Sequence, residues 1–157
     1  MGVCKEWSAH GLLCRVLDGP LKNFNGYVAV PKGHVAWGVD YDDLPIEVHG
    51  GLTFGQVGRN SDNWPDDSLW WFGFDTYHAG DYVEYTSEIK IDGRKWSLED
   101  VIGETETMAA QFSKMAQKVF LDYEARDAIE KYYGENFLEA LLDDDKEKMI
   151  SILKGGV

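Results

Sequence analysis

The sequence predicts an α+β fold in a single domain, 1–157, with a twisted, mainly antiparallel sheet over about residues 11–92 and packing helices over about residues 97–154. Short runs of apolar and β-branched residues separated by turn signals occupy the first part of the chain. At Ser97 the hydrophobic period changes from two to about 3.6. Strands followed by helices, without a linker or repeat, are typical of α+β domains, here β-rich over residues 1–96 and helical over 97–157.

About five to seven strands with short connections are expected in the β-rich part. Asn25-Gly26 and Ala79-Gly80 are turn signals, and a loop rich in Gly, Asn, Asp and Pro is expected over residues 55–68. The predicted strands are residues 12–18, 27–30, 46–49 with a continuation at 52–54, 69–75 and 81–91.

The helical part begins with an amphipathic helix whose apolar stripe runs from Leu98 to Val119. Ser97 is expected to cap its first turn. Three further helices are predicted: residues 122–133 with Gly134 as the stop, residues 136–142, and a final helix opened by a capping box of Asp144 and Glu147. The role of the helices after Leu121 stays open between a lid, a dimer contact and core.

Size, cysteine count and hydropathy predict a globular protein of the cytoplasm. A chain of 157 residues with 44% hydrophobic residues is large enough to bury a core without disulfides. No apolar stretch reaches the roughly 18 residues that a membrane span needs, and the N-terminus does not resemble a signal peptide. Two cysteines, Cys4 and Cys14, are expected to stay reduced.

Charge is the strongest global feature, because 28 acidic residues oppose 15 basic ones and give a net charge of -13. This charge argues against direct nucleic-acid binding and favours solubility, basic partners or cations. Trp37 and Trp64, which lie near the acidic residues, are predicted to be exposed at a partner-binding surface. The residues predicted to form that surface are Asp40, Asp42, Asp43, Asp62, Asp66 and Asp67.

The stretch WWFGFDTYHAGDY indicates a metal site. Asp75, His78 and Asp81 flank a turn that can bring them together, and His49, at the end of a predicted strand, is the best fourth ligand. Imidazole and carboxylate ligands suit Zn²⁺, Mn²⁺ or Fe²⁺. Four protein ligands would make a closed structural site, three with water a catalytic one, and a hydrogen-bonded network without metal is the alternative.

Two weaker candidates accompany this cluster. His34 is a second-tier ligand candidate, close enough along its loop to reach the site, and Cys4, His10 and Cys14 are a candidate soft-metal half-site. No phosphate-binding loop of the glycine-lysine type and no serine nucleophile elbow occur in the sequence.

Three motifs, NGYVAVPKGH, VHGGLTF and WWFGFDTYHAGD, resemble an uncharacterised family of small proteins found in bacteriophages and bacterial genomes. The resemblance covers about residues 24–120. It implies a phage-associated setting, and His49, Asp75, His78 and Asp81 match the family pattern. The chain departs from it at Thr76 and Tyr77, where the family often has a cysteine and a small residue.

Charge, size and this resemblance together favour an acidic phage protein that inhibits a nucleic-acid-targeting defence enzyme of the host, in the manner of anti-CRISPR proteins and DNA mimics. The expected partner is basic, such as a CRISPR effector or other defence nuclease, and the metal, zinc by preference, is structural. The alternatives are a metal-dependent hydrolase of a nucleotide or phosphoester, and a module that sequesters a nucleotide. Both lack nearby bases for phosphate, since only Lys32 and Arg59 lie close in sequence.

Overall fold

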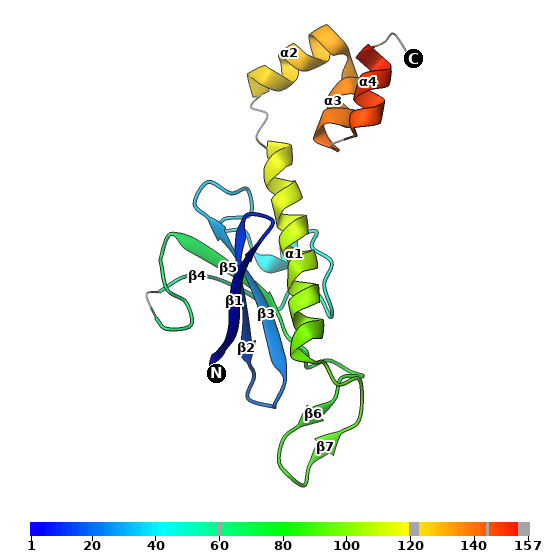
Figure 1. Ribbon diagram of the computed structural model, residues 1–157. Coiled ribbons are helices and arrows are strands. Elements are labelled where there is room, and N and C mark those ends of the chain that lie inside the picture. Colours follow the sequence, from blue (N-terminus) through cyan, green and yellow to red (C-terminus); the bar gives the residue numbers. More distant parts are fainter. Residues whose placement is uncertain (60, 120–122, 144, 154–157) are drawn as a thin grey trace. The chain divides into compact units, whose positions relative to one another are not determined.

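A computed structural model describes residues 1–59, 61–119, 123–143 and 145–153 and confirms the α+β class (Figure 1). A five-stranded sheet has the order β1-β2-β3-β5-β4, and every neighbouring pair is antiparallel. Its strands are β1 (Val3–Ala9), β2 (Leu12–Asp18), β3 (Phe24–Pro31), β4 (Phe54–Val57) and β5 (Leu69–Phe74).

The sheet begins earlier than predicted, because β1 precedes the expected start near residue 11. β1 is a largely exposed edge strand that carries charged residues, so its sequence lacks the apolar alternation of a half-buried strand. It is held by its ladder with β2 across a two-residue turn. Both turn residues, His10 and Gly11, have positive φ (51° and 77°), as the favoured hairpin turn requires.

Two other predicted strands are wrong. Residues 46–49 form no strand, and β4 instead occupies residues that the sequence assigned partly to the loop at 55–68. Residues 81–91 split into a separate hairpin of β6 (Val83–Glu84) and β7 (Lys90–Ile91), so the main sheet ends at Phe74 rather than near residue 92. The Thr86 hydroxyl accepts the N–H groups of Glu88 and Ile89 and thereby stabilises a turn inside the predicted strand.

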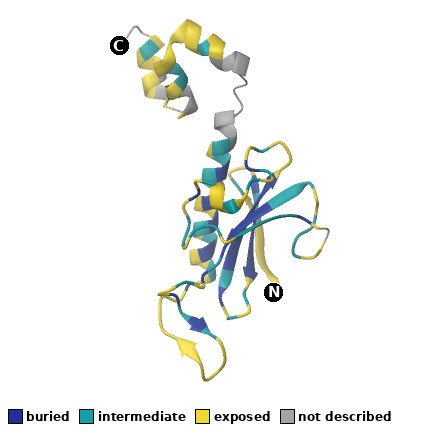
Figure 2. Ribbon diagram, turned by 180° about the vertical axis from the view of Figure 1, so that it is seen from behind, coloured by how far each residue is buried: buried dark blue, intermediate teal, exposed yellow. Residues whose placement is uncertain are grey.

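Both faces of the central strands are covered, which explains why β2, β3 and β5 are buried almost throughout (Figure 2). On one face Phe72 of β5 stacks on Phe112 of helix α1 (Leu98–Val119), with ring centroids 4.9 Å apart. On the other face Trp71 lies in a cluster with Tyr27, and Trp64 from the loop after β4 packs against it. Trp64 therefore packs against the core, and the prediction that it is exposed is wrong.

Trp37 is likewise half-buried rather than exposed. Its ring lies 5.8 Å from that of Trp70, and Lys32 places its Nζ 5.8 Å from the centre of the Trp37 ring. Aromatic and cationic neighbours thus cover much of the surface of this side chain. The prediction that Trp37 is exposed is therefore wrong, whereas its role in partner binding stays a prediction.

The helices largely agree with the predicted periodicity. Ser97 caps α1 as expected: its Oγ accepts the N–H of Asp100 (3.1 Å), and an Asp100 carboxylate oxygen accepts the N–H of Ser97 (2.9 Å). The later helices are α2 (Tyr123–Tyr133), α3 (Glu135–Leu142) and α4 (Lys146–Leu153). Asp122 and Asp144 lie outside the described residues, and the oxygen that caps α4 comes from Asp145, which accepts the N–H of Lys148 at 2.9 Å.

The chain divides into two compact units, residues 1–113 and residues 114–157, so the single-domain organisation stays a prediction. In the second unit, Gly134 separates α2 from α3 with a φ of 83°, the left-handed conformation expected of a helix stop. None of the described helices combines the length and apolar composition that crossing a bilayer requires.

The two thiols are expected to differ in reactivity. Cys14 is fully buried, and burial raises its pKa to about 11, whereas Cys4 is exposed. Titration of native protein with a disulfide reagent such as DTNB should modify one thiol per chain within minutes and the second only after denaturant is added. Cys4→Ser should abolish the native-state reaction, while rapid modification of both thiols would contradict the burial of Cys14.

Candidate functional site

His49, His78 and Asp81 come together in the first unit and form the one group of potential metal ligands found among the described residues. Each offers one ligand atom, and these atoms lie within 4.8 Å of one another. His49 comes from the irregular segment between the short helix η1 (Tyr41–Asp43) and β4, whereas His78 and Asp81 follow β5. Of the predicted convergence across the Ala-Gly turn, the part that joins His78 and Asp81 is therefore present in the fold.

The turn after β5 is built by local hydrogen bonds. Asp75 Oδ1 accepts the N–H of Tyr77 (3.0 Å), and the N–H of Asp81 donates to the carbonyl of His78 (2.9 Å). Gly80 has a φ of +95°, which glycine adopts without strain. The turn is anchored to β3, because the Thr76 hydroxyl donates to the Phe24 carbonyl at 2.8 Å.

Asp81 is the centre of the cluster and is 2% exposed. Its Oδ2 lies 2.8 Å from His49 Nε2 and accepts the backbone N–H of His78 at 2.8 Å, while its Oδ1 accepts the indole N–H of Trp96 at 3.0 Å. Burial by itself raises the pKa of Asp81, but the hydrogen bonds from His49, the His78 backbone and Trp96 outweigh burial and hold the pKa below its usual value. Asp81 is therefore an anionic centre within the fold.

His78 carries the observation that most favours a metal. Its buried Nδ1 has no hydrogen-bond partner and lies 3.5 Å from Asp81 Oδ2. Its Nε2 lies on the other side of the ring, 3.6 Å from Asp75 Oδ1. A carboxylate beside one ring nitrogen, with the other nitrogen facing a ligand, is the usual arrangement of metal-bound histidine. The donor set of two imidazoles and one carboxylate thus fits a divalent metal.

Asp75 differs from its predicted place as a fourth ligand, because it does not belong to the group whose ligand atoms converge. Its Oδ1 lies 3.6 Å from His78 Nε2, an ion-pair distance that is longer than a hydrogen bond. The set that converges is N2O rather than the predicted N2O2, and three protein ligands leave a coordination position for a further group.

His49 is positioned by two ring contacts and one backbone hydrogen bond. Its ring lies 4.5 Å from the Trp96 ring and 5.1 Å from the His78 ring, and its backbone N–H donates to Glu104 Oε1 at 2.7 Å. Sequence reasoning missed Trp96 and Glu104, since they lie far from His49 along the chain and no local pattern marks them. The one residue of the sequence that could have indicated this contact is Gly50, whose missing side chain leaves space for the His78 ring.

The weaker sequence candidates do not join the cluster. His34 Nδ1 accepts the N–H of Ala36 (3.0 Å), so its Nε2 donates to the carbonyl of Phe112 (2.9 Å) and ties its loop to α1. Cys4, His10 and Cys14 lie along the β1–β2 hairpin, where Cys14 is buried opposite Trp7 and His10 forms the turn. They form no metal group among the described residues.

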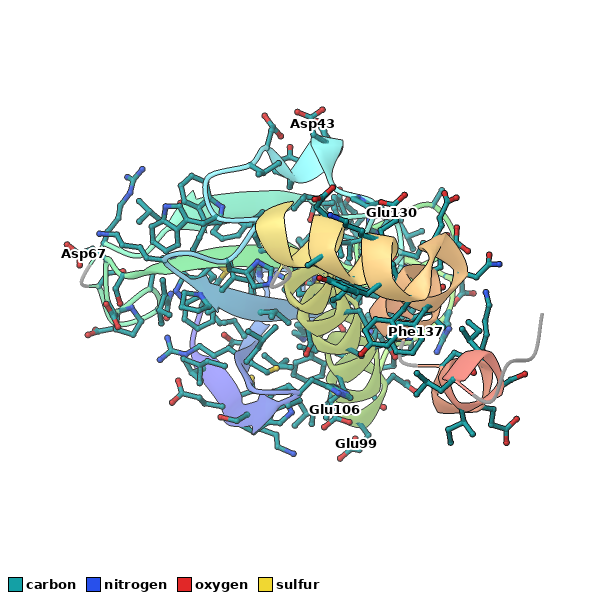
Figure 3. The ribbon with its side chains drawn as sticks, turned by 90° about the horizontal axis from the view of Figure 1, so that it is seen from above. Asp43, Asp67, Glu99, Glu106, Glu130 and Phe137 are labelled. Carbon is teal, nitrogen blue, oxygen red and sulfur yellow. The ribbon has the colours of Figure 1, made fainter. Side chains whose placement is uncertain are left out.

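The predicted acidic surface divides into two segments. All six aspartates are exposed. Asp40 Oδ1 accepts the N–H of Asp42, and Asp66 Oδ1 accepts the N–H and the hydroxyl of Ser68, which holds the pKa of Asp66 below its usual value. Figure 3 shows Asp43 and Asp67 at separate edges of the first unit. Of these six aspartates, four have side chains that form no hydrogen bond or ion pair within the described residues: Asp42, Asp43, Asp62 and Asp67.

Basic residues lie closer to the cluster than the sequence suggested. Arg94 pairs with Asp81 in a backbone bridge, and its guanidinium carbon lies 3.8 Å from the centre of the Trp96 ring. Lys95 follows it, with its Nζ 5.4 Å from the centre of the Tyr82 ring. The prediction that the cluster lacks nearby basic groups is wrong for Arg94, because the β6–β7 hairpin returns the chain to the turn that carries Asp81.

Comparison with known proteins adds no relative: no protein-family model, no curated protein and no solved structure matches this chain.

Proposed function

We propose that the protein binds one divalent metal ion, zinc by preference, through His49, His78 and Asp81, and acts as a phage-type acidic inhibitor of a host nucleic-acid-targeting defence enzyme such as a CRISPR effector. The partner-free Nδ1 of His78 supports the metal. The observation that carries the inhibitor proposal is the exposure of six aspartates on two anchored segments of a chain with a net charge of -13. Binding takes place in the cytoplasm of the host.

The position of the cluster supports a structural role for the metal. Asp81 joins the His49 segment, the turn after β5 and the segment that carries Trp96, and Glu104 joins α1 to the same group. Apart from α1, the segments that Asp81 joins have little regular secondary structure of their own. A metal that bonds two of them stabilises the folded state by its binding free energy, since the ligands are not assembled in the unfolded chain.

Anchoring of the acidic segments supports the inhibitor role. Asp40 caps η1, and the loop after β4 is fixed by Trp64 in the core and by Arg15, whose Nη1 donates to the Asn63 carbonyl at 2.7 Å. Carboxylates on fixed loops lose little conformational freedom when they dock. A basic nucleic-acid groove attracts them by the same electrostatics that attract phosphates.

Metal content is the first test. Elemental analysis of the tag-free protein by inductively coupled plasma mass spectrometry should find about one divalent metal per chain, lost in His49→Ala and in His78→Ala. His10→Ala is the matched control, because His10 lies in the β1–β2 turn and should leave the metal in place. At a free metal concentration of 100 times Kd, binding stabilises the fold by about 2.7 kcal/mol, and chelation should remove that stability. Wild-type protein that takes up no metal would contradict the site.

Charge reversal tests the inhibitor proposal. Added in excess, wild-type protein should inhibit DNA or RNA cleavage by at least one member of a panel of purified CRISPR effectors, and inhibition should weaken as salt rises. The fourfold change of Asp42, Asp43, Asp62 and Asp67 to Lys should abolish it while circular dichroism stays unchanged, since all four side chains are exposed and form no hydrogen bond or ion pair within the described residues. Equal inhibition by the variant, or no inhibition of any effector, would contradict the proposal.

Hydrolysis of a nucleotide or phosphoester is a second candidate, favoured by the coordination position that three ligands leave open and by Arg94 and Lys95 near the cluster. A bound divalent metal supplies Lewis-acid activation of water. Arg94 and Lys95 contribute positive charge for a phosphate. Turnover of bis(p-nitrophenyl) phosphate with Zn²⁺ or Mn²⁺, lost in His78→Ala, would favour the enzyme, and no turnover with metal bound would favour the structural role.

A further inference from the structure

We propose that Glu104 and Gln111 of α1 are positioning residues that fix the backbone of the His49 segment and so hold the His49 imidazole at Asp81. The consequence for metal affinity rests on the proposed metal site. The consequence for the backbone does not, because it concerns hydrogen bonds that are formed without a metal.

The His49 segment depends on support from outside itself. Residues 44–53 contain no helix or strand, although His49 must reach a buried carboxylate. The backbone hydrogen bonds within the segment are those from Ile46 N–H to Leu44 O and from Gly51 N–H to Val48 O, both 2.9 Å. Neither involves His49. A segment with so few internal hydrogen bonds samples many conformations unless other elements restrain it.

Two side chains of α1 provide that restraint. The Gln111 amide contacts both backbone groups of Glu47: its Oε1 accepts the N–H at 2.7 Å and its Nε2 donates to the carbonyl at 2.8 Å. Glu104 Oε1 accepts the N–H of His49 at 2.7 Å. Residues seven apart lie on the same side of an α-helix, about two turns from each other. Side chains on one face of α1 therefore satisfy backbone groups of the segment that would otherwise need a neighbouring strand or water.

This pairing determines where the imidazole lies. With its backbone held, His49 presents Nε2 to Asp81 at 2.8 Å and rests against the Trp96 ring. Without these hydrogen bonds the segment can move and the imidazole leaves Asp81 for part of the time. Loss of a group that orients a metal ligand typically weakens metal binding about 10–100-fold, and that is the effect expected here.

Four variants distinguish loss of the backbone hydrogen bonds from loss of the Glu104 charge and from a general loss of helix stability. Glu104→Ala removes the acceptor, whereas Glu104→Gln keeps an acceptor oxygen and removes the charge. Gln111→Ala removes both contacts with Glu47. Glu106→Ala is the matched control, because Glu106 lies on the same helix and accepts the Trp7 indole N–H at 3.1 Å, a contact remote from His49.

Two measurements are made on each full-length variant: hydrogen exchange of the His49 amide by NMR without metal, and Zn²⁺ affinity by competition with a chromophoric chelator. Glu104→Ala should lose amide protection and bind Zn²⁺ about 10–100-fold more weakly, and Gln111→Ala should weaken Zn²⁺ similarly. Glu104→Gln and Glu106→Ala should keep the wild-type amide protection and lose much less than about tenfold in Zn²⁺ affinity, the lower limit of the loss expected when an orienting group is removed.

The outcomes distinguish this inference from the metal proposal. If the wild type binds no Zn²⁺ but Glu104→Ala loses the amide protection that Glu104→Gln keeps, positioning stands and the metal proposal fails. If the wild type binds Zn²⁺ and all variants match it in affinity and protection, the positioning role is overturned. A loss in Glu104→Gln as large as in Glu104→Ala would also overturn it, because the charge of Glu104 would then be the cause.

Discussion

Asp81→Ala is expected to lower the free energy of unfolding by about 3–5 kcal/mol, the range measured when a buried charged partner is removed. Asp81 is 2% exposed and faces three donors: His49 Nε2, the His78 N–H and the Trp96 indole N–H. Alanine leaves these donors without their acceptor, and each donor that stays buried and unsatisfied costs about 1–3 kcal/mol. Urea denaturation followed by tryptophan fluorescence measures the loss.

A loss of this size can leave too little folded protein to study, so Asp81→Asn is a second variant. Asparagine keeps the volume and one acceptor oxygen but places an NH2 group among donors, and we expect a smaller loss of stability together with loss of metal. The matched control is Asp92→Ala, an exposed aspartate after β7, which should change stability by less than about 0.5 kcal/mol. If Asp81→Ala behaves like Asp92→Ala, the cluster does not support the fold.

Gly50→Ala is expected to displace His78 and abolish metal binding. Gly50 has a φ of +68°, and a Cβ at this position would overlap Cε1, Nε2 and Nδ1 of the His78 ring. Left-handed backbone costs a non-glycine residue about 1–2 kcal/mol. The overlap adds the cost of overpacking, typically about 1–3 kcal/mol, because the ring must leave the position in which Nδ1 faces Asp81.

Gly51 provides a control that shares the backbone cost but not the overlap. Its φ is +82°, and no atom lies within 4 Å of the position that a Cβ would take. Gly51→Ala should therefore lose about 1–2 kcal/mol of stability and keep its metal. Unfolding curves and Zn²⁺ titration of both variants make the comparison. If the two variants lose stability equally and both bind metal, the contact between Gly50 and His78 does not govern the site.

Much of the architecture was predictable because it depends on local periodicity. The buried runs of β2 and β5 and the 3.6-residue stripe of α1 each report one element's own buried face. The Ser97 cap was predictable for the same reason, since the capping contact is made within one turn. The errors arose where local pattern and tertiary context disagree. β1 is an exposed edge strand held by its partner, and residues 81–91 alternate like a strand but turn at Thr86.

For the candidate site, the sequence by itself determined which residue types were available: two carboxylates and an imidazole around a turn, and a histidine before two glycines. Tertiary structure decided their roles. It brought His49 to Asp81, left Asp75 beside His78 Nε2, and added Trp96, Glu104 and Arg94. The physical reason is distance along the chain. A turn restricts residues three apart, whereas a hydrogen bond across 32 residues depends on how helix and sheet pack, which no local pattern encodes.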